Sequence, residues 1–164
     1  GDFVSKINGH LHFALPQNTA SDYAWISSRQ SFALADCAVV VEMVLAPNPS
    51  APADSWMSMQ NHDLGARVDM HIQMDRLITY VAEGGGLIDR IEVEHDPVQH
   101  RWWRVREAAG RLLCQTSPDG SSWATHIDVA TPSVEPIGYL EIGAGTFPHA
   151  NPGVAAFDNF NRPP

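Results

Sequence analysis

The stretch that decides the fold is Arg67-Val68-Asp69-Met70-His71-Ile72-Gln73-Met74-Asp75. Polar and apolar residues alternate strictly along it. Successive side chains of a β-strand point to opposite faces, so the apolar residues share one face and the polar residues share the other. The pattern predicts a half-buried strand over residues 67–75, with a wholly polar outer row.

The same alternation recurs along the chain between turn residues, which is typical of a sandwich or barrel. Further strands are predicted at 9–15, 23–34, 37–46, 55–61, 77–83, 87–95, 100–108, 111–117, 123–130, 138–143 and 153–161. No stretch keeps an apolar spacing of three to four, so we expect little or no helix. Many strands with one apolar face each can bury that face only against a second sheet. We therefore expect an all-β, two-sheet antiparallel β-sandwich (jelly roll), forming a single domain over residues 1–164.

The connections carry turn chemistry. Proline excludes 47–52 from a sheet, and Ala109-Gly110 is short enough for a tight hairpin. The segment 117–122 has Pro and Gly where turns need them, and we expect Trp123, which follows it, to fold back onto the core. Loops at 16–22, 47–54 and 146–153 are candidate contact elements for a partner.

Composition narrows the classes of function. The 164 residues carry a net charge of -9, so no basic surface is expected for nucleic acid. No apolar run is long enough to cross a bilayer, and the N-terminus shows no export leader, so membrane insertion is not expected and any signal would lie outside this sequence. The two cysteines, Cys37 and Cys114, could pair in a disulfide or stay reduced as buried thiols.

Three segments carry a family resemblance: 100–107 (HRWWRVRE), 117–123 (SPDGSSW) and 153–160 (GVAAFDNF). Together they resemble the concanavalin A-like lectin/glucanase superfamily, and more narrowly the laminin G-like jelly-roll modules of bacterial secreted proteins and phage tail proteins. The resemblance covers about the last 65 residues. The resemblance implies a jelly roll. It does not choose among functions, because the superfamily includes sugar-binding modules, protein-binding modules, structural domains and glycoside hydrolases.

The paired tryptophans give the first candidate site. Adjacent strand residues face opposite ways, so if Trp103 is in the core, Trp102 lies on the outer face with Arg104 and Arg106. An indole beside guanidinium groups suits stacking on a sugar ring. In the alternative, a loop covers Trp102 or an arginine packs on it.

If their strands are neighbours in one sheet, a larger polar row would form the ligand-binding site. Its members are Asp69, His71, Gln73, Arg90, Glu92, Trp102, Arg104, Arg106 and Gln115. Aromatic stacking would supply affinity and side-chain hydrogen bonds would supply specificity.

Glu92 and Glu94 share a strand face at a spacing that a retaining glycosidase could use. Hydrolases of the resembled superfamily carry a Glu-x-Asp-x-x-Glu strand, however, and the run 92–96 (EVEHD) departs from it. A solvated strand face paired with Arg90 and Arg104 is the favoured interpretation, so no catalytic residue is assigned.

Metal binding has two candidates. His10 and His12 could supply two ligands, but no third is identifiable. Asp158 could hold a structural calcium, with help from Asp2, since related sandwiches often bind calcium near a chain end. Backbone amides satisfying Asp158 are the alternative.

These observations predict a non-catalytic binding or adhesion module for carbohydrate, such as a cell-surface glycan, that is extracellular or on a virion surface and part of a larger protein. The alternative is a structural or protein-interaction domain without a sugar site. A glycoside hydrolase using Glu92 and Glu94 is a third, less favoured, hypothesis.

Overall fold

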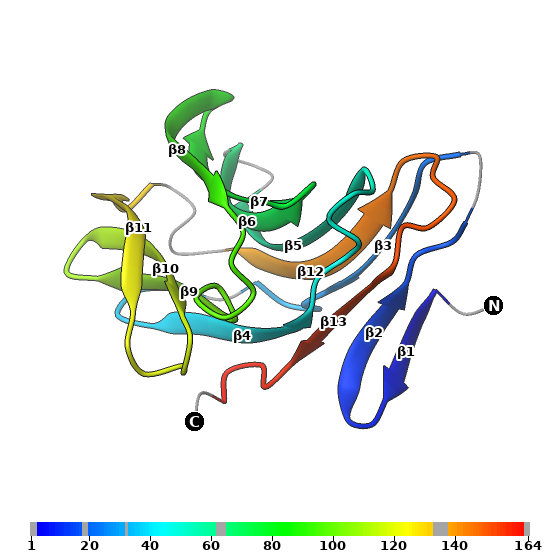
Figure 1. Cartoon of the computed structure of the whole chain (residues 1–164). Coiled ribbons are helices and arrows are strands. Elements are labelled where there is room, and N and C mark those ends of the chain that lie inside the picture. Colours follow the sequence, from blue (N-terminus) through cyan, green and yellow to red (C-terminus); the bar gives the residue numbers. More distant parts are fainter. Residues whose placement is uncertain (1–2, 18–19, 32, 62–64, 133–137, 163–164) are drawn as a thin grey trace.

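The computed structural model describes residues 3–17, 20–31, 33–61, 65–132 and 138–162, and these form two stacked antiparallel sheets (Figure 1). The seven-stranded sheet has the order β1 (Val4–Ile7), β2 (His10–Ala14), β13 (Val154–Asp158), β4 (Ala38–Leu45), β9 (Trp102–Ala108), β10 (Arg111–Ser117) and β11 (Ala124–Ala130). The six-stranded sheet has the order β3 (Asp22–Ser27), β12 (Tyr139–Thr146), β5 (Ala53–Asn61), β6 (Ala66–Gln73), β7 (Arg76–Glu83) and β8 (Gly86–Glu94). No helix occurs in these ranges, so the predicted all-β sandwich is confirmed.

The alternation in β6 determines which face of the six-stranded sheet is buried. Val68, Met70 and Ile72 lie in the core, as predicted. The expected inward position of Met74 is wrong, because Met74 and Asp75 have positive φ angles of 47° and 63° and form the turn to β7. Met74 is exposed. The polar row of β6 therefore ends at Gln73.

Aromatic side chains fill the space between the sheets. Trp103 is fully buried, and it packs edge-on against Phe157, which packs edge-on against Phe13. Large aromatic side chains contribute most to burying apolar area in a core of this kind. These three residues lie on β2, β9 and β13, so they pack the inner face of the seven-stranded sheet.

Turns account for the remaining differences from expectation. The tight hairpin at Ala109-Gly110 is confirmed, with positive φ at both residues. Strand β1 was not predicted, although Asn8-Gly9, with φ of 52° and 93°, forms a two-residue turn of the type that favours hairpins. Strand β3 is shorter than expected and ends at Ser27.

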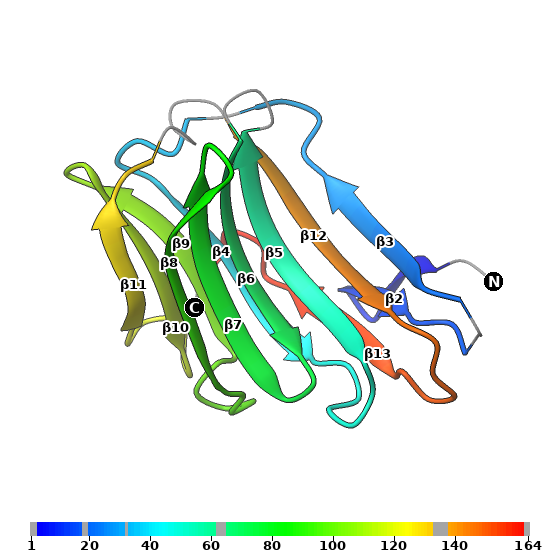
Figure 2. The same cartoon turned by 90° about the horizontal axis from the view of Figure 1, so that it is seen from above.

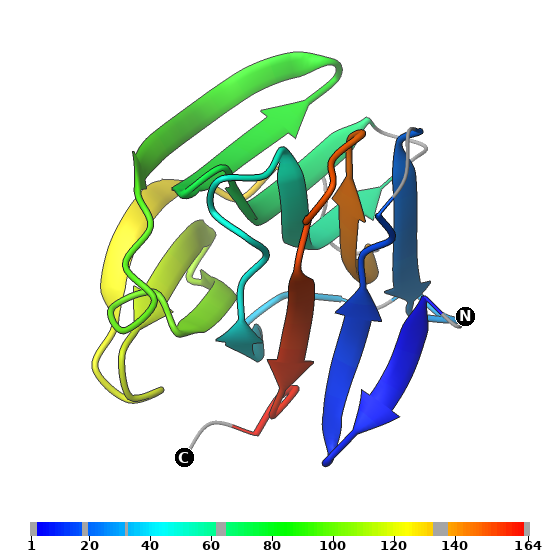
Figure 3. The ribbon, with the colours of Figure 1, turned by 45° about the vertical axis from the view of Figure 1, so that its right-hand side comes forward.

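The long loops at one end of the sandwich brace each other. The amide of Asn48 donates to the carbonyl of Pro152, and its side chain donates to the carbonyl of Asn151. Figure 3 shows the segment before β5 beside the segment that leads into β13, with β13 running between β2 and β4. Hydrogen bonds from Asn48 therefore join the loop before β5 to the loop before β13.

The six-stranded sheet is curved, and its concave face points away from the other sheet (Figure 1). Seen from above, its strands run side by side from β8 to β3 (Figure 2). Cys37 is exposed and Cys114 is buried, and both are free thiols. The described residues contain no helix long and apolar enough to cross a membrane.

Candidate functional site

A groove of about 390 Å³ lies on the concave face of the six-stranded sheet. Strands β3, β5, β6 and β7 line it with the side chains of Tyr23, Asp54, Trp56, Arg67, Asp69, His71, Gln73 and Tyr80. Antiparallel register brings these residues together, since Asp54 is opposite Gln73, Trp56 opposite His71, and Asp69 opposite Tyr80. The groove thus combines aromatic rings with charged and amide groups.

Two glycines of β12 create the aromatic floor of the groove. Gly143 is opposite Trp56, and a Cβ at this position would lie 2.4 Å from Cζ2 of that indole. Gly145 is opposite Tyr23, and a Cβ there would lie 1.9 Å from Cδ1 of the tyrosine ring. Any side chain at these positions would displace the rings. The missing Cβ atoms allow both rings to lie close against the sheet.

The aromatic floor extends to the edge of the sheet. The rings of Tyr23 and Trp56 lie 6.3 Å apart at a 53° tilt, and Phe147 packs edge-on against Tyr23 at 6.0 Å. Trp25 is opposite Gly143 on the edge strand and is 54% exposed. Planar apolar rings with polar neighbours are the usual means of stacking against a sugar ring.

Asp69 organises the polar side of the groove. Its carboxylate, which is 1% exposed, accepts hydrogen bonds from Arg67 Nε at 2.8 Å and from the Tyr80 hydroxyl at 3.3 Å, and a further contact from Arg67 Nη2. His71 Nδ1 lies 3.0 Å from Asp69 Oδ1 and donates to it, which leaves Nε2 as the other ring nitrogen. Arg67 also lies over the Tyr80 ring at 5.7 Å. A network satisfied in this way holds its side chains in fixed positions.

These contacts shift the titration of the groove residues. Burial lowers the pKa of His71, but the hydrogen bond with Asp69 and the charges of Asp54 and Asp69 outweigh burial, so the pKa lies above its ordinary value. Burial, and then the charge of Asp69, raise the pKa of Tyr80 to about 12. At neutral pH the tyrosine therefore remains a hydrogen-bond donor.

Asp54 differs from Asp69 because its Oδ1 atom is buried without a hydrogen-bond partner. Burial raises the pKa of Asp54 to about 6, the charge of His71 lowers it, and the charge of Asp69 raises it. A buried acceptor without a donor costs free energy. Perturbed carboxyls in a groove are frequent at functional sites.

The structure separates the predicted ligand-binding residues into two groups. Asp69, His71 and Gln73 lie on the concave face, and Arg90 and Glu92 lie on the same face at its β8 edge. The assumption that all the strands are neighbours in one sheet is wrong. Trp102, Arg104, Arg106 and Gln115 belong to β9 and β10 of the seven-stranded sheet.

The expected exposure of Trp102 is also not found, because this residue is only 4% exposed. Arg104 lies over the ring of Trp123 at 4.0 Å and donates to Gln115 at 2.8 Å. Trp123 therefore stacks on the outer face of this sheet and does not join the core as expected. Trp102 is thus covered, as in the alternative weighed from the sequence, but the indole that packs on an arginine is that of Trp123.

Glu92 lacks the properties of a catalytic acid. Its carboxylate lies 2.6 Å from Arg90 Nη2 and 3.4 Å from Arg76 Nε. The hydrogen bond from Arg90 lowers the pKa of Glu92, whereas a general acid needs a raised pKa. Glu92 and Glu94 thus form the solvated strand face that the sequence favoured, although the cation partners are Arg76 and Arg90.

The residues near Asp158 do not fit a calcium site. Its Oδ2 lies 2.9 Å from His10 Nδ1, and the neighbouring Asn159 amide donates to Glu42 at 2.6 Å. Within the described ranges, no group of three His, Cys, Asp or Glu side chains could hold a metal ion. Asp2, the suggested second ligand, lies outside the described residues.

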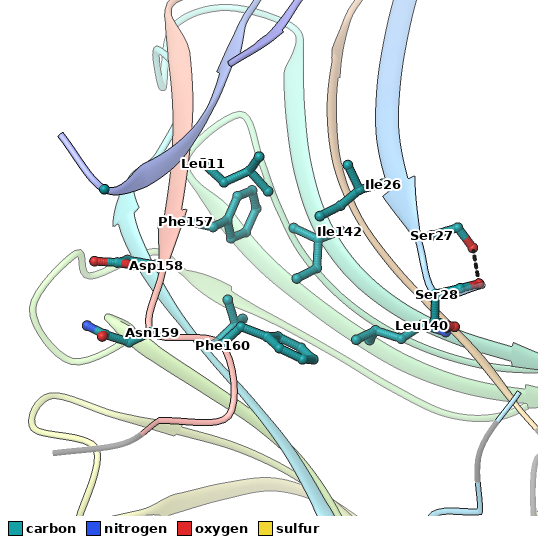
Figure 4. A pocket seen from close by; sticks show the side chains of 12 residues that line it. Leu11, Ile26, Ser27, Ser28, Leu140, Ile142, Phe157, Asp158, Asn159 and Phe160 are labelled. Atoms are coloured by element: carbon teal, nitrogen blue, oxygen red, sulfur yellow. Dashed lines mark hydrogen bonds between the residues drawn. The ribbon is translucent and has the colours of Figure 1, made fainter. Parts of the chain in front are cut away.

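A second cavity, of about 360 Å³, opens between the two sheets (Figure 4). Apolar side chains such as Leu11, Ile26, Ile142 and Phe157 point into it from both layers. Asp158 and Asn159 lie at its rim, where they are already paired. The cavity offers few hydrogen-bonding groups, so the concave groove is the better candidate for a polar ligand.

Sequence reasoning missed most of the groove. Asp54 and Trp56 alternate along β5 as Asp69 and His71 do along β6, and this alternation was an available signal, although the predicted strand began only at residue 55. The alternate glycines of β12, Gly143 and Gly145, were a second available signal. Glycines two residues apart in a strand can indicate that another group approaches the backbone closely.

Comparison with known proteins supports the fold. No family model and no curated protein matches the sequence. A legume lectin-like domain from Entamoeba histolytica matches with a TM-score of 0.65 at 8% identity, over 94% of this chain and 82% of that one. The exoplasmic/lumenal domain of VIP36, solved with Ca²⁺ and Man3GlcNAc, gives 0.62 at 13% identity over 94% and 80%.

A structure from work on endo-acting O-glycanases of the human gut microbiota gives a TM-score of 0.67 at 9% identity, over 95% of this chain and 79% of that one. At such identities the likeness shows the fold alone. The neighbours include lectins and glycanases, so the fold does not decide whether the chain is catalytic. The chain has the jelly-roll fold of the concanavalin A-like lectins and glucanases.

Proposed function

We propose that the protein binds carbohydrate in the groove on the concave face of its six-stranded sheet. The observation that carries this proposal is the pair of rings, Trp56 and Tyr23, that lie over Gly143 and Gly145 beside an ordered polar network. The rings supply flat apolar surfaces for sugar faces. The VIP36 domain, a neighbour of the same fold, was solved with a bound mannose-containing sugar, which supports this class of ligand.

The polar residues would supply specificity. Asp54 Oδ1 is an acceptor without a donor, and His71 Nε2 and the amide of Gln73 lie in the same groove. Because Asp69 already holds Arg67, His71 and Tyr80, little side-chain entropy would be lost when a ligand binds. The site differs from the predicted one in its aromatic residues, since Trp56 and Tyr23 take the role assigned to Trp102.

We propose binding without bond cleavage. The only carboxylate pair singled out for catalysis, Glu92 and Glu94, lies at the edge strand beside two arginines. An adhesive role outside the cell or on a virion, and the narrower likeness to laminin G-like modules, stay predictions. A VIP36 neighbour was solved with Ca²⁺, but Asp158, the residue suggested for calcium, is paired with His10, so we propose no calcium at that residue.

A glycan array tests the proposal with two matched variants. Trp56→Ala removes the aromatic floor, whereas Trp123→Ala removes an indole that stacks on Arg104 in the other sheet. We expect the wild type and Trp123→Ala to bind the same glycans, and Trp56→Ala to bind roughly tenfold more weakly or worse. Circular dichroism would check that both variants fold.

Two results would count against the proposal. If the wild-type protein binds no glycan on the array, the structural or protein-interaction alternative gains. If Trp56→Ala binds as well as the wild type while Trp123→Ala does not, the ligand occupies the outer face of the seven-stranded sheet, where Arg104 and Gln115 lie.

A further inference from the structure

The charge of the groove restricts which glycans could enter it. Three arginines lie on the strands of the concave face, and each is already paired with a carboxylate of the chain itself. Arg67 binds Asp69, while Arg76 and Arg90 both bind Glu92. Acidic sugars are commonly recognised by arginine forks that engage a carboxylate or sulfate through two hydrogen bonds. The charge of each arginine is therefore offset by a carboxylate of the chain itself.

Three carboxylates lie on the same strands, in or beside the groove. Asp69 is almost fully buried, and Glu141, which is next to it across β5, accepts a hydrogen bond from Gln60. Asp54 adds a third carboxylate, whose Oδ1 is buried and unpartnered. The Asp54 side chain lines the groove, so its negative charge favours a hydroxyl or an ammonium group of a ligand nearby. A ligand carboxylate cannot donate, and it would be repelled at short range.

We propose that the groove selects glycans whose units carry hydroxyl or amine groups, and excludes glycans with an acidic group on each unit, with Asp54 as the residue that sets this selectivity. The inference rests on the proposed function, since it names the ligand class of the same groove. Asp54 acts here through the negative charge of its carboxylate, which lines the groove.

Matched hexasaccharides provide the test. Each set keeps one linkage and one ring configuration and changes a single group, as in cellohexaose, the β-1,4-linked glucuronate hexamer and the β-1,4-linked glucosamine hexamer. A second set uses mannohexaose and the mannuronate hexamer. Calorimetric titration at pH 7.5 should show that the acidic member binds at least about tenfold more weakly than the neutral member of any set that binds. The amine should bind at least as tightly as its neutral counterpart.

Two variants assign the effect to Asp54. Asp54→Asn should narrow the gap between neutral and acidic hexamers, because it removes the negative charge and keeps the shape of the side chain. Asp128→Asn is the matched control, since Asp128 is exposed and paired with Arg111 on the other sheet, and it should leave the gap unchanged. Added salt should also narrow the gap in the wild type.

Lowering the pH from 7.5 to 5 should act in the same direction as Asp54→Asn. The groups that face Asp54 are Tyr23 on β3 and Arg67, Asp69 and His71 on β6. Protonation of Asp54 and His71 makes the groove less negative, while the uronate ligand stays ionised. Acidic hexamers should therefore gain affinity relative to neutral ones.

The outcomes are distinct. An acidic hexamer that binds as tightly as its neutral counterpart, or a gap that Asp54→Asn leaves intact, overturns the charge selectivity while leaving sugar binding in place. If no hexamer binds and the array is blank, the proposed function itself fails.

Discussion

Replacing Asp54 by asparagine should stabilise the fold at neutral pH. Burial raises the pKa of this carboxyl from 3.8 to about 6. The folded protein thus keeps the proton to a higher pH than the unfolded chain does, and the ionised carboxylate destabilises the fold. This cost is absent below pH 3.8, grows as the pH rises towards 6, and is constant above that. It amounts to about 3 kcal/mol at pH 7.5 and about 1 kcal/mol at pH 4.5.

Urea unfolding at pH 7.5 and pH 4.5 measures this difference. An uncharged amide of the same shape avoids the cost, so Asp54→Asn should raise the free energy of unfolding more at pH 7.5 than at pH 4.5. The melting temperature at pH 7.5 should rise by roughly 6–12 °C. Asp128→Asn, at an exposed ion pair, should give no such gain at either pH. A variant at Asp54 that is less stable than the wild type at pH 7.5 would refute the idea that the groove holds a costly, unsatisfied carboxylate.

Three further predictions concern the groove floor, acid stability and metal binding. Gly145→Ala should weaken glycan binding, because its methyl group displaces the Tyr23 ring, while the half-exposed ring can move and keep the loss in melting temperature small; unchanged affinity on the array would contradict this. Burial lowers the pKa of His100 to about 4, so stability should fall as the pH drops from 6.5 towards 4, and His100→Gln should reduce that fall in urea titrations; an equal fall in the variant would argue against it. EDTA should leave the melting temperature unchanged, because Asp158 is paired with His10, whereas a lower melting temperature would show that a native-state ion is bound.

The fold was largely predictable because strand alternation is a local property. The residues of β6 from Val68 to Gln73 point as their alternation indicates, and the core side of the strand follows from it. The strand's end was not predictable, because the left-handed turn at Met74-Asp75 carries neither Gly nor Asn. By contrast, Asn8-Gly9 was a usable turn signal for the missed strand β1.

The site was only partly predictable because sheet order is not a local property. The alternation placed Asp69, His71 and Gln73 on one face correctly, but it could not tell which strands flank them. The true neighbours are β5 and β7, so the aromatic partner is Trp56 and the conspicuous Trp102 belongs to the other sheet. In this chain the paired tryptophans at 102 and 103 therefore indicated the fold but not the binding face.

Backbone chemical-shift mapping with an array-identified oligosaccharide tests the location of the site most directly. The account predicts that shifts concentrate on β12, β5 and β6, including the amides of Gly143 and Gly145 and the indole N–H of Trp56, with little change on β9 and β10. Shifts that cluster instead around Arg104 and Trp123, with none in the groove, would contradict it.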